Sequence, residues 1–232
     1  PKGAPLGPGL PIPERSVDYQ ELSVYLEKQF LPRLSGFVEV PARFLNPDLN
    51  ANAAGFSDLN AGAKFAFLTR EEFLASFQFR TYAPTGDGDR GLGTEHVSLE
   101  PALLWWKGAG DRLALQGELR YWVPVGGTDF AGDVIRYGLG ASYDLLPFGG
   151  GMRLAPVAEV VGWTVLGGKE SFPGPTGIVS VEDAAGDTII NAKLGVRFGF
   201  GERADFYAGY GRALTGERWY ADIFRVEARW FY

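Results

Sequence analysis

His96 and Ser98 come closest, by residue type and spacing, to a catalytic arrangement in this chain. Residues two apart in a β-strand point to the same face, so the His96 imidazole could take a proton from the Ser98 hydroxyl. A hydrolase of membrane lipids would need this pair to face its substrate. The apolar residues Val97, Leu99 and Leu103 instead take the opposite face, and no acidic residue follows at a recognisable spacing to orient the imidazole. We therefore predict that the protein is not an enzyme.

Charged residues recur on one face of many alternating segments. The set expected on that face is Glu39, Arg43, Lys64, Arg80, Glu100, Glu118, Arg120, Arg136, Glu159, Lys193, Arg197, Arg225, Glu227 and Arg229. Arg or Lys facing lipid at the bilayer midplane would cost about 2–4 kcal/mol, so we predict that these residues line the interior of a barrel. Two interpretations stay open: a solute path with a mixed electrostatic lining, or a closed ion-pair network that only stabilises a narrow barrel.

Acidic residues also gather in the connecting segments, as Asp87 and Asp89, as Asp129 and Asp133, and as Glu182, Asp183 and Asp187. Clustered oxygen ligands suit Ca²⁺, but none of these segments matches an EF-hand loop. Solvated turn chemistry explains them better, because Asp favours turns. We expect no metal and no cofactor.

The last residues alternate between apolar and charged side chains. Phe224, Val226, Ala228, Trp230 and Tyr232 share one face, and the charged residues between them share the other. A strand with these faces, ending on an aromatic residue, is typical of the C-terminal signal that directs β-barrels into an outer membrane. We predict that this set is an insertion signal, with its apolar face toward lipid.

Composition agrees with a barrel. The 232 residues are 46% hydrophobic and 14% aromatic, with 33 glycines and no cysteine, and the mean hydropathy is -0.06. No apolar run approaches the ~20 residues that a membrane-spanning helix needs. The absence of cysteine excludes thiol catalysis and cysteine-type zinc sites. The net charge of -6 leaves no basic stripe for a nucleic acid.

The order of the elements predicts an all-β fold, an antiparallel transmembrane β-barrel with short periplasmic turns and longer extracellular loops. Residues 1–16 form a Pro/Gly-rich N-terminal tail, and residues 17–232 form the barrel. The segments expected as strands are 19–30, 34–44, 58–67, 73–82, 96–106, 112–125, 134–145, 153–165, 188–200, 205–214 and 219–232. Bacterial single-chain barrels have even strand numbers, so we expect about 12 strands, of which 11 are readable. The twelfth lies before Pro1, comes from the proline-rich segment, or is hidden in a mis-split segment.

Aromatic residues gather at the ends of the expected strands, as Tyr82, Trp105, Trp106, Tyr121, Trp122, Trp163, Trp219 and Tyr220. At a membrane–water interface an aromatic ring can be buried while its polar atom stays hydrated. We therefore predict that these residues form interfacial girdles.

Several segments resemble the "MetA-pathway of phenol degradation" family of proposed outer-membrane transporters. The resemblance rests on Gly55-Phe56-Ser57-Asp58-Leu59 leading to Gly62 and Lys64, and on Tyr82-Ala83-Pro84-Thr85-Gly86-Asp87. It also rests on Gly186-Asp187-Thr188-Ile189-Ile190-Asn191 leading to Gly195-Val196-Arg197, and on the segment from Gly209 to Thr215. The motifs are mostly turn and glycine chemistry, and their order along the chain makes the resemblance specific. It implies a barrel that passes small solutes, aromatic ones among them, and it brings no catalytic residues.

Three functional hypotheses follow. The first is a narrow channel or transporter in the outer membrane of a Gram-negative bacterium. The second is a plugged structural barrel that anchors partner proteins through the N-terminal tail or the loop 167–187. The third is an outer-membrane lipid hydrolase using His96 and Ser98. The expected partners are the lipid bilayer and, during insertion, the barrel-assembly machinery, with no nucleic acid.

Overall fold

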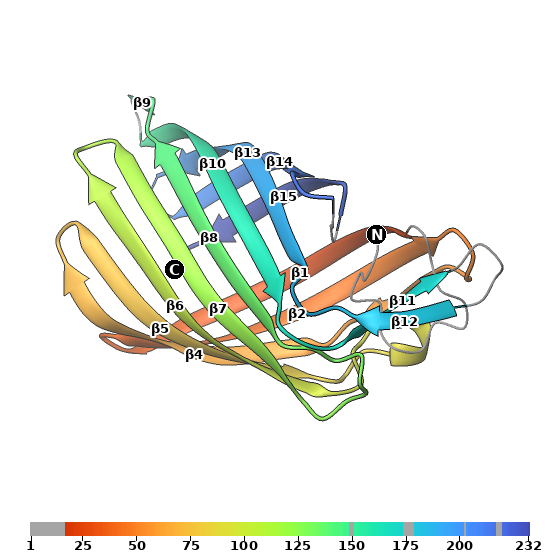
Figure 1. Ribbon diagram of the computed structural model, residues 1–232. Coiled ribbons are helices and arrows are strands. Elements are labelled where there is room, and N and C mark those ends of the chain that lie inside the picture. Colours follow the sequence, from red (N-terminus) through yellow and green to blue (C-terminus); the bar gives the residue numbers. More distant parts are fainter. Residues whose placement is uncertain (1–16, 149–150, 174–178, 202, 217–219) are drawn as a thin grey trace.

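The chain folds into one large curled antiparallel sheet. The computed structural model describes residues 17–148, 151–173, 179–201, 203–216 and 220–232 (Figure 1). The main path of the sheet comprises β1 (Val17–Leu31), β2 (Leu34–Pro47), β4 (Leu59–Arg70), β5 (Phe73–Ala83), β6 (Val97–Ala109), β7 (Leu113–Val125), β8 (Val134–Tyr143), β10 (Met152–Val165), β13 (Thr188–Phe200), β14 (Ala204–Ala213) and β15 (Asp222–Trp230). These are the eleven segments expected as strands, in chain order, so the all-β antiparallel fold is confirmed.

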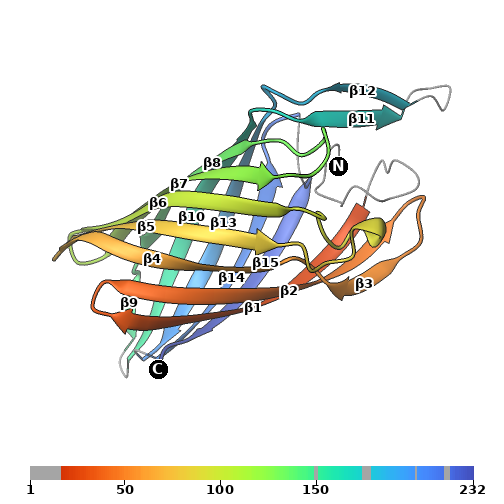
Figure 2. The same ribbon diagram turned by 90° about the horizontal axis from the view of Figure 1, so that it is seen from below.

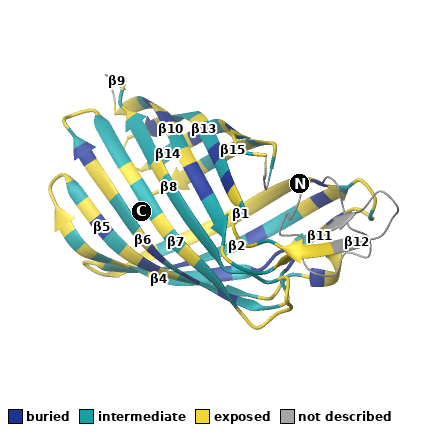
Figure 3. Ribbon diagram, viewed as in Figure 1, coloured by how far each residue is buried: buried dark blue, intermediate teal, exposed yellow. Residues whose placement is uncertain are grey.

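Neighbouring strands pair antiparallel, and the register assigns every side chain to a face. Lys64 on β4 lies opposite Gln78 on β5, which lies opposite Ala102 on β6, and Ala102 lies opposite Arg120 on β7. We call the face that carries Lys64 and Arg120 the inner face. Leu119, next to Arg120, points to the outer face, because side chains alternate along a strand. Figure 3 shows the resulting alternation of burial along the strands.

The sheet curls until its first and last strands face each other, as Figure 2 shows. No β1–β15 ladder is present among the described residues, so the sheet stays open along these two edges. The phenol of Tyr232 donates a hydrogen bond to the backbone carbonyl of Glu27 on β1, at 3.3 Å. Strands β1 and β15 run in the same direction, because ten antiparallel steps separate them along the sheet.

Long connections gather at one end of the sheet and short turns at the other, as the sequence predicts. Some segments expected to be loops contain further strands. The loop 46–57 holds β3 (Ala53–Phe56), which pairs with β2, and the loop 167–187 holds the hairpin of β11 (Lys169–Pro173) and β12 (Val179–Asp183). The short β9 (Leu146–Phe148) pairs with β10, and the loop after β5 holds a 3₁₀ turn, η1 (Gly88–Arg90).

A small apolar cluster lies at the long-loop end. It consists of Val17, Leu45, Ala53 and Leu92, which come from β1, β2, β3 and the loop after η1. This cluster ties the loop to the beginning of the sheet. No helix among the described residues is long and apolar enough to cross a bilayer.

Candidate functional site

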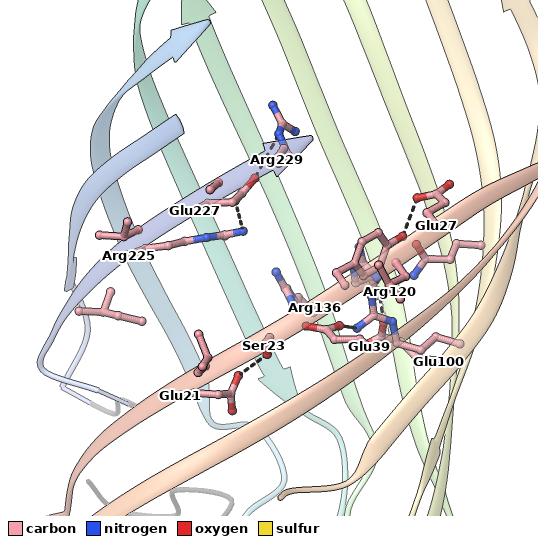
Figure 4. Close-up of a pocket in the computed structure, with 18 of the residues that line it drawn as sticks. Glu21, Ser23, Glu27, Glu39, Glu100, Arg120, Arg136, Arg225, Glu227 and Arg229 are labelled. Carbon is pink, nitrogen blue, oxygen red and sulfur yellow. Dashed lines mark hydrogen bonds and ion pairs between the residues drawn. The ribbon is translucent and has the colours of Figure 1, made fainter. Parts of the chain in front are cut away.

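A hollow of about 3700 Å³ lies inside the curl of the sheet (Figure 4). Its lining runs from Tyr19 and Asn52 at the long-loop end to Gln29 and Trp106 at the short-turn end, so the hollow extends along the strands. It also opens between the unpaired edges of β1 and β15. We take this hollow as the candidate functional site.

All fourteen charged residues predicted to face the interior lie on the inner face by register. Ten of them line the hollow, and the exceptions are Arg43, Glu118, Glu159 and Arg197. A part in solute passage stays a prediction for the whole set.

Arg120 on β7 joins two carboxylates on the inner face. Its Nη1 lies 2.8 Å from Glu100 Oε1, and its Nε lies 2.8 Å from Glu118 Oε2. Glu118 also holds Arg136 on β8, with Nε at 2.9 Å from Oε1. Both Arg120 and Glu100 are nearly buried, so pairing and hydrogen bonding must offset the loss of their hydration. The result is a row of alternating charges across β6, β7 and β8.

A second pair extends this row toward β2. Arg80 Nη1 on β5 lies 2.9 Å from Glu39 Oε2 on β2. Between them, β4 presents Gly62, which has no side chain to separate the two groups. The phenol of Tyr82, two residues beyond Arg80, donates to Glu100 at 3.2 Å. The wall from β2 to β8 is therefore tied together by charge and hydrogen bonds.

The last three strands of the main path carry a separate network. Asp205 on β14 accepts from Arg197 on β13 and from Arg229 on β15, whose Nη2 lies 2.7 Å away. Glu227 adds contacts to Arg225 at 2.7 Å and to Arg229 at 3.3 Å. Because Asp205 bridges two strands, it holds the guanidinium groups against the wall.

Strand β1 contributes carboxylates that the sequence analysis missed. Glu21 pairs with Arg43 at 2.7 Å, and Glu27 pairs with Lys64 at 2.7 Å. The signal was present in the sequence, since Glu21 and Glu27 alternate with Leu22 and Leu26. Asp205 was missed in the same way, although it shares parity with Arg197 through the pairing of β13 with β14.

The structure corrects the girdle prediction for half of the aromatic residues. Tyr82, Trp106, Trp122 and Trp163 lie on the inner face, Trp105 and Tyr121 lie on the outer face, Tyr220 lines the hollow, and Trp219 is outside the described residues. The Tyr82 and Trp122 rings stack with centroids 5.2 Å apart, and Arg136 lies over Trp163 at 5.5 Å. The physical reason is that these rings cover cations and each other instead of meeting lipid.

Asp58 fixes the loop between β5 and β6. Its carboxylate accepts hydrogen bonds from Gly86 N at 3.0 Å, from Thr94 N at 2.8 Å and from Thr94 Oγ1 at 2.7 Å. The loop is thereby held at both ends by one buried side chain. It places Leu92 in the apolar cluster and Arg90 at the wall of the hollow. Asp58 and Gly86 both lie in segments that carry the family resemblance, but their hydrogen bond could not be predicted because they lie far apart in the chain.

His96 and Ser98 do not form a dyad in this structure. The His96 Nδ1 lies 2.7 Å from the carbonyl oxygen of Thr94, and the fully buried Ser98 Oγ has no hydrogen-bond partner among the described residues. Ser98 lies on the inner face beside Tyr82, away from the apolar outer face. This geometry gives the hydrolase hypothesis no support.

The acidic loop residues form no metal site among the residues that the structure describes. Asp129 instead pairs with Lys169 at 3.0 Å, and Asp133 accepts from the phenol of Tyr121 at 2.5 Å. Turn and ion-pair chemistry therefore accounts for these two aspartates.

The predicted insertion signal lies at the edge of the sheet. Phe224, Val226, Ala228 and Trp230 point to the outer face of β15, and Tyr232 follows the strand. All five are exposed. Recognition by an insertion machinery stays a prediction.

Comparison with solved structures supports the fold. The chain is similar to an outer membrane channel from Pseudomonas putida F1, with a TM-score of 0.61 and 17% sequence identity, over 92% of this chain and 82% of that chain. No family model matches the sequence. No curated protein matches it either. The likeness establishes a shared barrel-like architecture, and membership in the family that the motifs resemble stays a prediction.

Proposed function

We propose that the protein spans a bacterial outer membrane as a β-barrel and forms a narrow channel for small solutes. One observation carries the proposal: a charged hollow runs along the inside of a curled sheet whose outer face is apolar. Large apolar side chains are exposed on strands all along the sheet, including Leu26, Phe65, Phe79, Leu103, Leu119, Leu139, Val160, Leu194 and Val226. In water this surface would promote association, whereas in a bilayer it meets lipid.

The wall of the hollow suits small polar or aromatic solutes. Ion-paired side chains supply polar contacts, and the inner-face rings of Tyr82, Trp122 and Trp163 supply flat apolar surface. We infer a solute class of small molecules, aromatic ones among them. The long ion-paired side chains on its wall, together with a strand number between eight and sixteen, favour a narrow path over a wide water-filled pore.

Solute flux tests this proposal. The full chain, refolded into liposomes, should allow swelling in small sugars, with a rate that falls steeply as the sugar becomes larger. Liposomes that contain heat-denatured protein serve as the control. Correctly folded protein that needs detergent for extraction, yet gives no swelling with any sugar, would remove the channel function.

A structural role is a second candidate, because the hairpin β11–β12 stands apart from the main sheet. Its two strands pair only with each other among the described residues, so a partner protein could add a strand to either edge. Deleting residues 169–183 should abolish capture of any such partner and leave solute flux intact. Unchanged capture after this deletion would exclude the hairpin as the anchor.

A further inference from the structure

Lys193 differs from the paired charges of the inner face. It lies on β13, lines the hollow, and is only half-buried, yet within the part of the chain that the structure describes no carboxylate lies within ion-pair distance of its ammonium. Glu159 is its cross-strand neighbour on β10 and makes no ion pair there either. The ammonium has three N–H donors, and no carboxylate among the described residues takes them up, so they can bind an anion.

Two further cations act on Lys193 from the strands that lie two positions away on either side of β13. Arg136 on β8 and Arg225 on β15 repel it, while Glu159 and Glu118 attract it. On β14, between Lys193 and Arg225, the inner face presents Gly209 and Gly211, and the side chains of Tyr207 and Ile223 lie over these two glycines. A Cβ at position 211 would lie 2.7 Å from the Lys193 Cγ, which shows that the lysine side chain lies directly over this glycine.

The two arginines keep donors free for a ligand. Arg136 Nε lies at ion-pair distance from Glu118 and the guanidinium lies over the Trp163 ring, while Arg225 donates from Nη2 to Glu227. A guanidinium has five N–H donors, so each group can still donate to an anion. Figure 4 shows Arg136 and Arg225 extending into the hollow from different sides.

Tyr220 adds a hydroxyl to the same region. Its phenol oxygen is buried and has no hydrogen-bond partner among the described residues, and Arg136, Glu159 and Arg225 all act on it. Burial, together with the nearby phenol of Tyr19, raises the pKa of Tyr220 to about 12. The hydroxyl therefore stays protonated at neutral pH and is available as a donor.

We propose that Arg136, Lys193, Arg225 and Tyr220 form a subsite that binds the carboxylate or phosphate group of a small solute. Arg136 is paired with Glu118 and Arg225 with Glu227, which leaves Lys193 as the cation of this group without an ion pair among the described residues. Among the residues that line the hollow, ten are basic and seven are acidic, although the protein carries a net charge of -6. The subsite rests on the proposed channel function, since a solute must be able to enter the hollow.

Calorimetry on the full chain in a non-ionic detergent tests the subsite. Inorganic phosphate and succinate, titrated at low ionic strength, should each bind, and the neutral analogue succinamide should not. Lys193→Gln and Arg225→Gln should each weaken binding about tenfold, because each removes one charge-assisted contact. The matched control is Arg212→Gln, which removes a cation from the exposed outer face and should leave binding unchanged.

The outcomes separate the two proposals. Absence of phosphate and succinate binding, or equal binding by all three variants and the parent chain, would overturn the subsite. Binding by succinamide as strong as by succinate would also overturn it. Saturable anion binding without solute flux would leave the subsite in place and remove the channel, whereas flux without anion binding would do the reverse. Heat-modifiable migration on gels shows that each variant is folded.

Discussion

Arg120 is the side chain on which the alternating charges of the wall depend most. It contacts both Glu100 and Glu118, and the exposed fractions of the Arg120 and Glu100 side chains are 13% and 5%. Removing Arg120 leaves the buried Glu100 carboxylate without an ion pair and Glu118 with Arg136 alone. The pair of Lys64 and Glu27 has the same chemistry, but its side chains are 27% and 30% exposed.

We therefore expect Arg120→Met to lower the free energy of unfolding by about 3 kcal/mol and Lys64→Met to lower it by about 1 kcal/mol. Guanidinium unfolding in lipid vesicles, followed by tryptophan fluorescence, measures both values. Equal effects of the two substitutions would contradict the assignment of Arg120 as the centre of the network.

Asp58 governs the loop between β5 and β6 through its three hydrogen bonds to Gly86 and Thr94. Asp58→Asn replaces an ionised acceptor with a neutral amide, and hydrogen bonds to charged groups are the stronger kind. Hydrogen exchange at the amides of Gly86 and Thr94 should become at least about tenfold faster. Asp87→Asn changes the same functional group at an exposed site of the loop and should have no such effect. Unchanged exchange in Asp58→Asn would show that other contacts fix the loop.

The outer and inner faces of each strand should differ in how well they tolerate a charged substitution. Leu119 lies near the centre of β7 on the outer face, and Gln116 lies on the inner face of the same strand. Leu119→Arg should destabilise the barrel in lipid by about 2–4 kcal/mol, because the charge meets the hydrocarbon region. Gln116→Arg should cost less than about 1 kcal/mol, because its guanidinium enters the polar hollow. The free energy of unfolding of each variant, measured in vesicles, tests this difference. An unchanged free energy of unfolding in Leu119→Arg would contradict the membrane-spanning orientation.

The elements of the main sheet follow from alternation in the sequence. Leu113–Val125 shows why: a regular change from apolar to polar residues determines both the strand and its faces. The four-residue β3 and the hairpin β11–β12 are too short or too irregular for the same argument, and long-range pairing with β2 defines β3. The rings of Tyr82, Trp122 and Trp163 were placed incorrectly, because an aromatic residue at a strand end is compatible with either face until the register is known.

The alternation of faces along a strand does not by itself predict the surroundings of Arg212. It lies on the same face as Phe206, the outer face of β14, where a charge is unexpected. The structure places its side chain near the end of the strand, 71% exposed and 3.9 Å from Asp222. Position along the strand, and not the face alone, decides whether a charge meets lipid.

At the scale of the whole molecule, the barrel is open between β1 and β15 among the described residues. The structure retains the eleven expected strands in the main sheet, so mis-splitting does not explain the odd number. Unpaired strand edges are not tolerated in a bilayer, because every backbone polar group there needs a partner. Since β1 and β15 run in the same direction, one additional strand would pair antiparallel with both, and we predict twelve strands.

Cysteine pairs test this closure, because the chain has no cysteine of its own. Leu22→Cys, Val24→Cys and Leu26→Cys are each combined with Val226→Cys, all on the outer face of the two edge strands. With an intervening strand, the edges lie about 10 Å apart, so a reagent of that length should link them and direct oxidation should not. Efficient disulfide formation in any pair would show that β1 and β15 pair directly and that twelve strands is wrong.

Single-channel recording of the full chain in planar lipid bilayers tests the central claim most directly. The charged hollow inside an apolar outer face should give discrete conductance steps, and the excess of basic lining residues should shift the zero-current potential in a salt gradient toward that of the anion. Lys193→Gln should reduce this shift, and Arg212→Gln should leave it unchanged. Folded protein that inserts into the bilayer and conducts no ions would contradict the account of the hollow as a solute path.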